Sequence, residues 1–130
     1  MSPPEQTRVL VRLAVPADPG YLALCRHALA GAGTALGLED DSVEDLKLVL
    51  SEMCTNAIQH GYGGGEGVIE LEFRTSTREF EVRIRDHGVG IGPPPWPAGT
   101  GLELLRSLTL RHSLEPAAGG GTLITFAAAR

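Results

Sequence analysis

An acid and an amide lie four residues apart in the stretch from Ser51 to Tyr62, which reads SEMCTNAIQHGY. If this stretch is helical, Glu52 and Asn56 share one face and are separated by one turn. An amide oxygen is a hard ligand that suits magnesium, and a carboxylate one turn away can accept a proton or orient a water molecule. The same pattern also fits the solvated face of an amphipathic helix, so the spacing alone leaves both interpretations open.

Two polar residues are expected to face inward at the ends of strands. Asp86 continues the inward alternation that begins at Phe80, and Thr122 has the same parity as Phe126. Because a buried carboxylate is costly without donors, Asp86 either caps the loop after it or accepts from a ligand, such as the exocyclic amine of adenine. Thr122 is either an ordinary satisfied buried threonine or a second part of the same base pocket.

Two glycine clusters follow the helix, one from Asp86 to Gly92 and one from Gly99 to Leu102. Either cluster alone can simply relieve a tight turn. The second one opens a short helix expected from about Thr100 to Leu108, and the free backbone N–H groups at a helix start form an anion site. The helix dipole contributes only roughly 0.3–1 kcal/mol, so this end would orient phosphates, and an amide-held magnesium ion would neutralise them.

The rest of the chain predicts the elements that would position these residues. Alternating apolar residues predict strands, and apolar residues repeating every three or four positions predict two long helices. The first helix is expected to start at Asp18 and stop at Gly37, and the second to start with a capping box of Asp41 and Glu44. The predicted strands are Arg8–Val15, Ile69–Phe73, Phe80–Ile84, Leu108–Leu114 and Thr122–Ala128. This order predicts an α+β fold, a two-layer α/β sandwich whose mixed, mostly antiparallel sheet carries helices on one face.

Composition and charge restrict the class of protein. A chain of 130 residues with 42% hydrophobic and 21% charged residues fits one globular domain, residues 1–130. The net charge of −5 argues against a nucleic-acid backbone as the main partner. No apolar run approaches the roughly 20 residues of a membrane span, and the start is too polar for a secretory signal. Cys25 and Cys54 fit reduced packing residues, so we expect a cytoplasmic protein.

Taken in order, four motifs resemble the nucleotide-binding motifs of the GHKL ATPases, the family that includes histidine-kinase catalytic domains, DNA gyrase and MutL. They are Glu52-x-x-x-Asn56, Asp86-x-Gly88-x-Gly90, Gly99-x-Gly101 and Gly121-Thr122. Within that family, the stretch from Ser51 to Tyr62 is similar to the bacterial anti-sigma serine kinases of the RsbW and SpoIIAB kind. The resemblance covers about Arg8 to the C-terminus and implies the Bergerat ATP-binding fold.

The resemblance also implies a role for each matching residue. Asn56 would be the metal ligand, holding the magnesium ion that bridges the phosphates, and Glu52 would be the catalytic base. Asp86 would accept from the adenine amino group, with Thr122 in support. The other nucleotide-binding positions would be Gly88, Gly90, Gly99, Thr100, Gly101 and Leu102. The implied cofactors are therefore ATP and Mg²⁺.

The resemblance further implies an ATP-dependent serine/threonine-protein kinase that acts as an anti-sigma regulatory factor. Such a protein would phosphorylate a serine of an anti-anti-sigma (STAS-type) partner and would bind and silence a sigma factor. Relatives suggest a homodimer. Neither direct nucleic-acid binding nor membrane association is expected.

One segment departs from the family pattern. From Gly92 to Gly99 the chain has a brief proline-rich segment where the family has a longer polar lid, and no Lys or Arg lies between Arg85 and Arg106. Phosphoryl transfer depends on positioning and charge stabilisation, so this departure favours an alternative. The alternative is an ATP-binding regulatory module that works by protein association without significant kinase activity. Trp96 would either anchor the segment or cover the base, and His87 is expected to face solvent.

Overall fold

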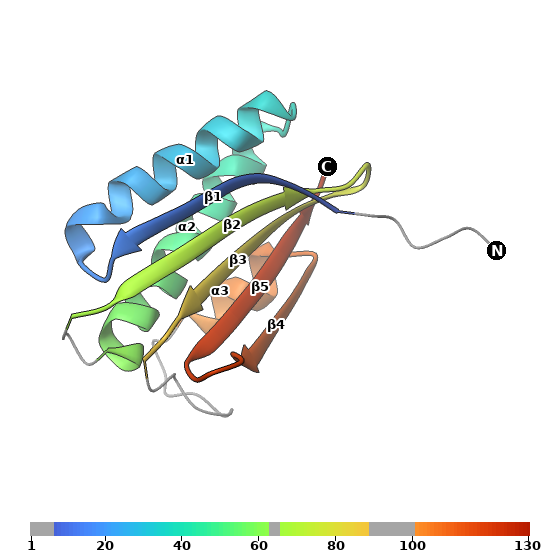
Figure 1. Cartoon of the computed structure of the whole chain (residues 1–130). Helices are drawn as coiled ribbons and strands as arrows, with labels where there is room; N and C mark the ends of the chain where they lie inside the picture. The colour runs from blue at the N-terminus through green and yellow to red at the C-terminus, as the bar shows by residue number, and fades with distance from the viewer. Residues whose placement is uncertain (1–6, 63–65, 89–100) are drawn as a thin grey trace.

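The computed structural model describes residues 7–62, 66–88 and 101–130. Five strands form one sheet in the order β1-β2-β3-β5-β4, and every pairing in it is antiparallel. Among the described residues, three α-helices cover one face of the sheet and none lies on the other face (Figure 1). The elements are β1 (Arg8–Pro16), η1 (Pro19–Tyr21), α1 (Leu22–Ala35), α2 (Asp40–Asn56), η2 (Ala57–Gly61), β2 (Val68–Thr75), β3 (Glu79–Asp86), α3 (Leu102–Leu108), β4 (Arg111–Pro116) and β5 (Thr122–Ala129). The predicted two-layer α+β architecture is confirmed, with a sheet that is antiparallel rather than mixed.

The core lies between the sheet and the helices, and strand alternation determines which side chains enter it. Phe73 on β2, Phe80 on β3 and Phe126 on β5 are all completely buried, as the period of two predicts. The rings of Phe73 and Phe80 are 6.0 Å apart between centroids. From the helix layer, α2 and the first residue of η2 contribute the predicted apolar side, which is Val43, Leu46, Leu50, Met53, Cys54 and Ala57. The side chains that face away from the helices are free to be polar.

The two cysteines behave as packing residues, as predicted. Cys25 on α1 and Cys54 on α2 are both free thiols with 1% exposure. Their side chains are hydrogen-bonded to each other, which joins the two helices in the core. In the parts of the chain that are described, no helix is both long and apolar enough to cross a membrane.

The predicted start and stop of the first helix are confirmed. The Asp18 carboxylate accepts a hydrogen bond from the Gly20 amide at 2.7 Å, at the start of the 3₁₀ turn that leads into α1. Gly37 has φ of +79°, the left-handed conformation that ends a helix and favours glycine. These two local signals therefore fix both ends of the first helical segment.

The predicted capping box of α2 is wrong. The helix begins at Asp40, its N-cap is Glu39 without a side-chain cap, and Asp41 therefore lies inside the first turn. The helix starts at Asp40 because Leu38 and Val43 are both buried and occupy the two positions of a hydrophobic staple around that start. The acidic residues of the first turn instead face the positive end of the helix dipole.

The last hairpin begins later than predicted. Leu108 ends α3 instead of starting a strand, and β4 runs from Arg111 to Pro116. The hydroxyl of Thr109 donates to the Leu105 carbonyl at the end of α3, so the chain turns before it can pair. The partner strand β5 lies where it was expected, and the turn between them holds three glycines with positive φ.

Candidate nucleotide-binding site

Two buried polar side chains meet at one end of the sheet. Asp86 is the last residue of β3 and is 3% exposed, while Thr122 is the first residue of β5 and is 8% exposed. The register pairs Arg85 with Leu123, which places Asp86 next to Thr122. The predicted inward orientation of both residues is thus confirmed.

The Asp86 carboxylate is held by backbone amides. Gly88 N–H donates to its Oδ1 at 3.0 Å, and the Thr122 backbone N–H also donates to the carboxylate. Burial raises the pKa of Asp86 above its usual value, and the two amides offset part of that effect. Asp86 therefore does cap the loop after it, one of the two roles left open by the sequence. An ionised carboxylate has about four acceptor positions, so capacity remains for a donor from a ligand.

Gly121 brings the backbone of β5 into contact with the backbone of β3. Its φ is +86°, and a Cβ atom at this position would lie 2.0 Å from the carbonyl oxygen of Asp86. Only a glycine permits this approach, so Gly121 sets how closely Thr122 and Asp86 come together. Gly121 belongs to one of the predicted motifs, but this packing role was not predicted for it, although the run of three glycines before a strand was a usable signal.

Asn56 and Glu52 lie on α2, where the helix reaches the same end of the sheet. Asn56 is only 4% exposed, which rules out a solvated helix face for this residue, and Glu52 is half-buried. Asn56 is the last α-helical residue before the π-helical turn η2. A π-helical turn is rare and frequently lies at a functional site.

The start of α3 packs against the part of α2 that carries Glu52. Gly101, at the N-cap of α3, has φ of +81°, and a Cβ atom there would lie 2.9 Å from Cβ of Glu52 and 3.1 Å from Cε of Met53. Leu102 follows as the first helical residue. The structure thus brings Glu52 next to Gly101, two of the predicted site residues from separate motifs. The predicted positions Gly90, Gly99 and Thr100, together with Trp96, lie outside the described residues.

Tyr62 joins this end of the sheet to the helix layer. Its hydroxyl donates to the Val68 carbonyl at 2.6 Å and accepts from the His87 amide at 2.7 Å. The His87 side chain is exposed, as predicted, and pairs with Glu70. No role was assigned to Tyr62 from the sequence, because contacts between residues 25 positions apart leave no trace in periodicity.

These side chains fit a magnesium nucleotide better than a metal bound by protein alone. Within residues 7–62, 66–88 and 101–130, no group of three or more His, Cys, Asp or Glu side chains converges on a point. A magnesium ion at Asn56 would therefore take most of its oxygen ligands from phosphates and water, which is usual for this ion. The spare acceptor capacity of Asp86 is available to the other end of such a ligand.

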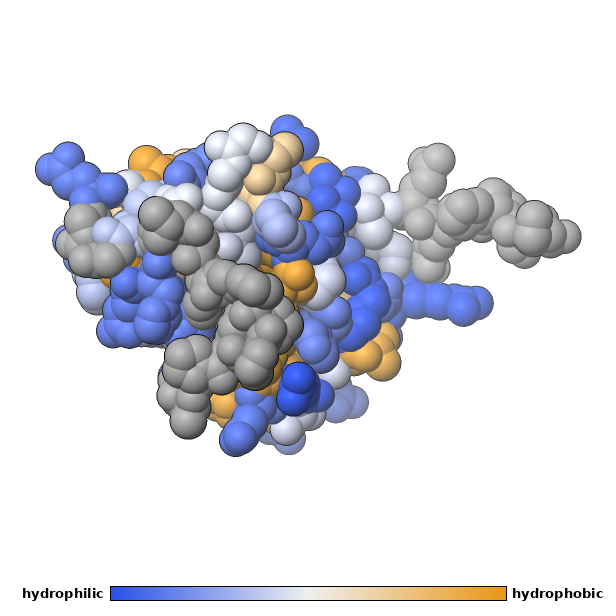
Figure 2. Space-filling model, turned by 90° about the horizontal axis from the view of Figure 1, so that it is seen from below, coloured by the Kyte–Doolittle hydropathy of each residue, from blue (hydrophilic) through white to orange (hydrophobic). Residues whose placement is uncertain are grey.

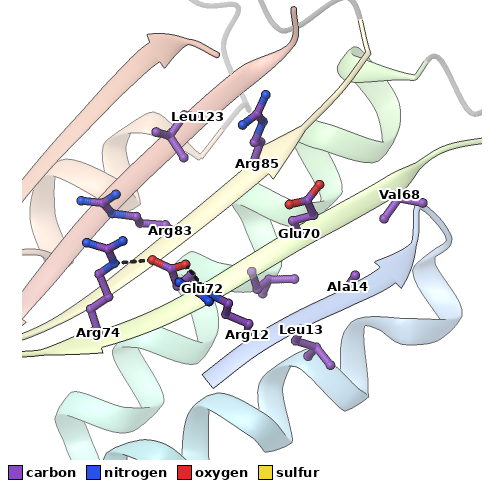
Figure 3. Close-up of a pocket in the computed structure, with 11 residues that line it drawn as sticks. Arg12, Leu13, Ala14, Val68, Glu70, Glu72, Arg74, Arg83, Arg85 and Leu123 are labelled. Carbon is purple, nitrogen blue, oxygen red and sulfur yellow. Dashed lines mark hydrogen bonds and ion pairs between the residues drawn. The ribbon is translucent and has the colours of Figure 1, made fainter. Parts of the chain in front are cut away.

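The surface at this end of the molecule is mixed in character. Figure 2 views the molecule from below Figure 1, and the described residues visible there include both hydrophobic and hydrophilic ones side by side. A hollow of about 480 Å³ lies elsewhere, on the sheet face without helices (Figure 3). Arginines from three strands line it, and Glu72 pairs with both Arg12 and Arg74 there. None of the candidate site residues lines this hollow, so it is separate from the site.

An α+β sandwich with these motifs in this order defines a class of proteins, the GHKL-like ATPase domains. The chain belongs to this class, because residues 15–127 match the family model described as histidine kinase-like ATPase domain. The match begins at the end of β1 and ends in β5, so it includes every element that carries a candidate site residue.

Among curated proteins, the chain is similar to bacterial serine-protein kinases named RsbW. Serine-protein kinase RsbW of Bacillus pumilus is 40% identical over 62 residues, which cover 48% of this chain and 38% of that relative. The protein of the same name from Bacillus subtilis is 44% identical over 52 residues, which cover 40% of this chain and 32% of that relative. The chain thus matches well under half the length of these relatives.

A solved structure shows the same fold. The RsbU and RsbW domains of Rv1364c from Mycobacterium tuberculosis align with a TM-score of 0.64 and 18% sequence identity. The alignment covers 93% of this chain and 33% of that one. At this identity the likeness concerns the fold alone, and it supports the arrangement of sheet and helices described above.

Proposed function

We propose that this protein is an ATP- and Mg²⁺-dependent serine kinase of the anti-sigma type that works in the cytoplasm. It would phosphorylate a serine of an anti-anti-sigma, STAS-type partner and would also bind a sigma factor. The observation that carries this proposal is the buried Asp86 carboxylate, held by the amides of Gly88 and Thr122 at the sheet end where α2 terminates. The names of the curated relatives support the kinase part of the proposal.

Each residue has a defined chemical task in this proposal. Asp86 accepts from the exocyclic amine of adenine, and Asn56 offers its amide oxygen to the magnesium ion. The bound magnesium supplies charge neutralisation at the phosphates. Glu52 takes the proton from the partner's serine hydroxyl, a contribution of typically 10²–10⁴-fold. The backbone at Gly101 lies against Glu52, so phosphates bound there would be near the base.

The substitution Glu52→Ala tests the kinase assignment. We expect it to retain ATP binding, measured by calorimetry, and to lose at least about 10²-fold in transfer of labelled phosphate to the partner serine. Glu103→Ala is the matched control, because Glu103 is an exposed carboxylate on α3 and has no proposed role. Transfer by Glu52→Ala at the wild-type rate would contradict the role of Glu52 as the base.

A second function is a nucleotide-binding regulatory module without significant kinase activity. One observation favours it: no Lys or Arg occurs between Arg85 and Arg106, so this part of the chain offers no cation to the γ-phosphate. The two functions differ in one measurement. Wild-type protein that binds ATP and retains its sigma factor, but forms no phosphoserine on a STAS-type partner, would be the module.

A further inference from the structure

The hydroxyl of Tyr62 connects three segments that are distant in the chain. Tyr62 follows η2, donates to the carbonyl of Val68 at the start of β2, and accepts from the amide of His87 just after β3. Both hydrogen bonds are short, at 2.6 and 2.7 Å. A tyrosine hydroxyl has one donor and can accept as well, so this one group satisfies two backbone positions.

The tyrosine ring itself is held in place. A Cβ atom at Gly67 would lie 2.4 Å from the ring, so the ring rests directly on the backbone at that glycine. The Gly67 carbonyl in turn accepts from the Ala17 amide at 2.8 Å, which connects this point to the end of β1. The position of the Tyr62 hydroxyl is therefore fixed by the packing of its ring on Gly67 and by the hydrogen bond between Gly67 and Ala17.

The peptide group between Asp86 and His87 is held next to the Asp86 carboxylate. The N–H of this group belongs to His87 and donates to the Tyr62 hydroxyl. From the other side, the backbone at Gly121 touches the Asp86 carbonyl. The end of β3 is therefore held from both sides, by a hydroxyl on one and by a close glycine on the other.

We infer that Tyr62 is a positioning residue of the base pocket, which fixes Asp86 so that it distinguishes an amino group from an oxo group at position 6 of a purine. This inference rests on the proposed function. A carboxylate accepts from an amino group and repels an oxo group, and that preference is strong only when the carboxylate is held in one direction. Removal of the hydroxyl frees the amide of His87 and lets the end of β3 rotate.

The test compares ATP with inosine triphosphate, which has an oxo group in place of the adenine amine. We expect wild-type protein to bind ATP at least about tenfold more tightly. In Tyr62→Phe, ATP affinity should fall by about 5–20-fold while inosine triphosphate affinity changes by less than about twofold. The amide of His87 should also exchange its hydrogen faster in Tyr62→Phe, because its acceptor is gone.

Tyr21→Phe is the matched control, since the chain has two tyrosines and Tyr21 is 42% exposed on η1. It should leave both affinities and the His87 exchange rate unchanged. Equal losses of ATP and inosine triphosphate affinity in Tyr62→Phe, or unaltered hydrogen exchange at His87, would overturn the positioning role of Tyr62 and leave the proposed function standing. Wild-type protein that binds neither nucleotide would overturn the proposed function, and this assignment with it.

Discussion

At the scale of single residues, Gly121 offers a direct test of the close contact at the site. The substitution Gly121→Ala would place a side chain at φ of +86° and 2.0 Å from the Asp86 carbonyl oxygen. The left-handed conformation costs roughly 1–2 kcal/mol, and relief of the overlap requires β5 to move. We expect a loss of about 2–4 kcal/mol in the free energy of unfolding, measured by urea denaturation.

Gly119→Ala separates the two causes of that loss. Gly119 has nearly the same φ, +85°, but nothing lies within 4 Å of a Cβ atom there. It should lose only the conformational part, about 1 kcal/mol. Equal losses in the two variants would show that the contact between Gly121 and Asp86 contributes nothing.

The sequence predicted some of the site residues and not others, for a physical reason. Strand parity alone predicted that Asp86 and Thr122 point inward, because the side-chain period of a strand is two. Tyr62 and Gly121 act through contacts with backbone atoms far away in the chain, and no local pattern encodes such contacts. The burial of Asn56 was also not predicted, because helical periodicity placed this residue on the polar side of α2.

At the scale of elements, a charged network connects β3 to β4 on the face of the sheet without helices. Glu81 on β3 is 4% exposed and accepts from Arg83 at 2.7 Å and from Arg111 on β4 at 2.6 Å. The ion pair to Arg111 crosses over β5 at Ala127, the residue that both Glu81 and Arg111 face in the register. The small side chain of Ala127 leaves space for this crossing.

Glu81 should make the stability of the protein depend on pH. Burial alone would raise the pKa of Glu81, but hydrogen bonds from Arg111 and Arg83 outweigh burial and lower it. A lowered folded-state pKa gives stability that is present above the unfolded value, about 4.3, and is lost as the pH falls through the folded value. We expect Glu81→Gln to cost about 1–3 kcal/mol of unfolding free energy at neutral pH, and clearly less at about pH 3.

The measurement is urea unfolding of both proteins at the two pH values. Glu44→Gln is the control, because the Glu44 pair with Lys47 is exposed on α2 and exposed pairs contribute about 0–1 kcal/mol. If Glu81→Gln lost the same free energy at both pH values, the ionised form of Glu81 would not be the source of the stability.

The elements themselves were predicted unequally well. Strand and helix interiors followed from periodicity, the start of the 3₁₀ turn that leads into α1 followed from Asp18, and the stop after α1 followed from Gly37. The start of α2 did not, because burial of Leu38 and Val43 outweighed the local capping signal at Asp41. The start of β4 was misplaced for a related reason, since Leu108 packs as the last turn of α3.

At the scale of the whole molecule, the candidate site depends on elements from most of the chain. Its residues come from α2, β3, the start of α3 and β5. Periodicity predicts each of these elements separately, but only the folded structure brings them together. A ligand bound there would contact both layers of the sandwich. Its binding free energy would therefore add to the stability of the entire fold and not of one segment.

Thermal unfolding with and without nucleotide tests this coupling. At about 100 times its Kd, a ligand that binds only the folded state adds about 2.7 kcal/mol, which for 130 residues corresponds to a rise of roughly 8–13 °C in Tm. We expect this rise with ATP and Mg²⁺, a smaller one when the metal is chelated, and the full rise in Glu52→Ala. Asp86→Asn should lose most of it, because the backbone N–H groups of Gly88 and Thr122 would engage the amide oxygen and leave the NH₂ group facing the adenine amine. An unchanged Tm of wild-type protein at saturating ATP and Mg²⁺ would reject nucleotide binding at this end of the sheet.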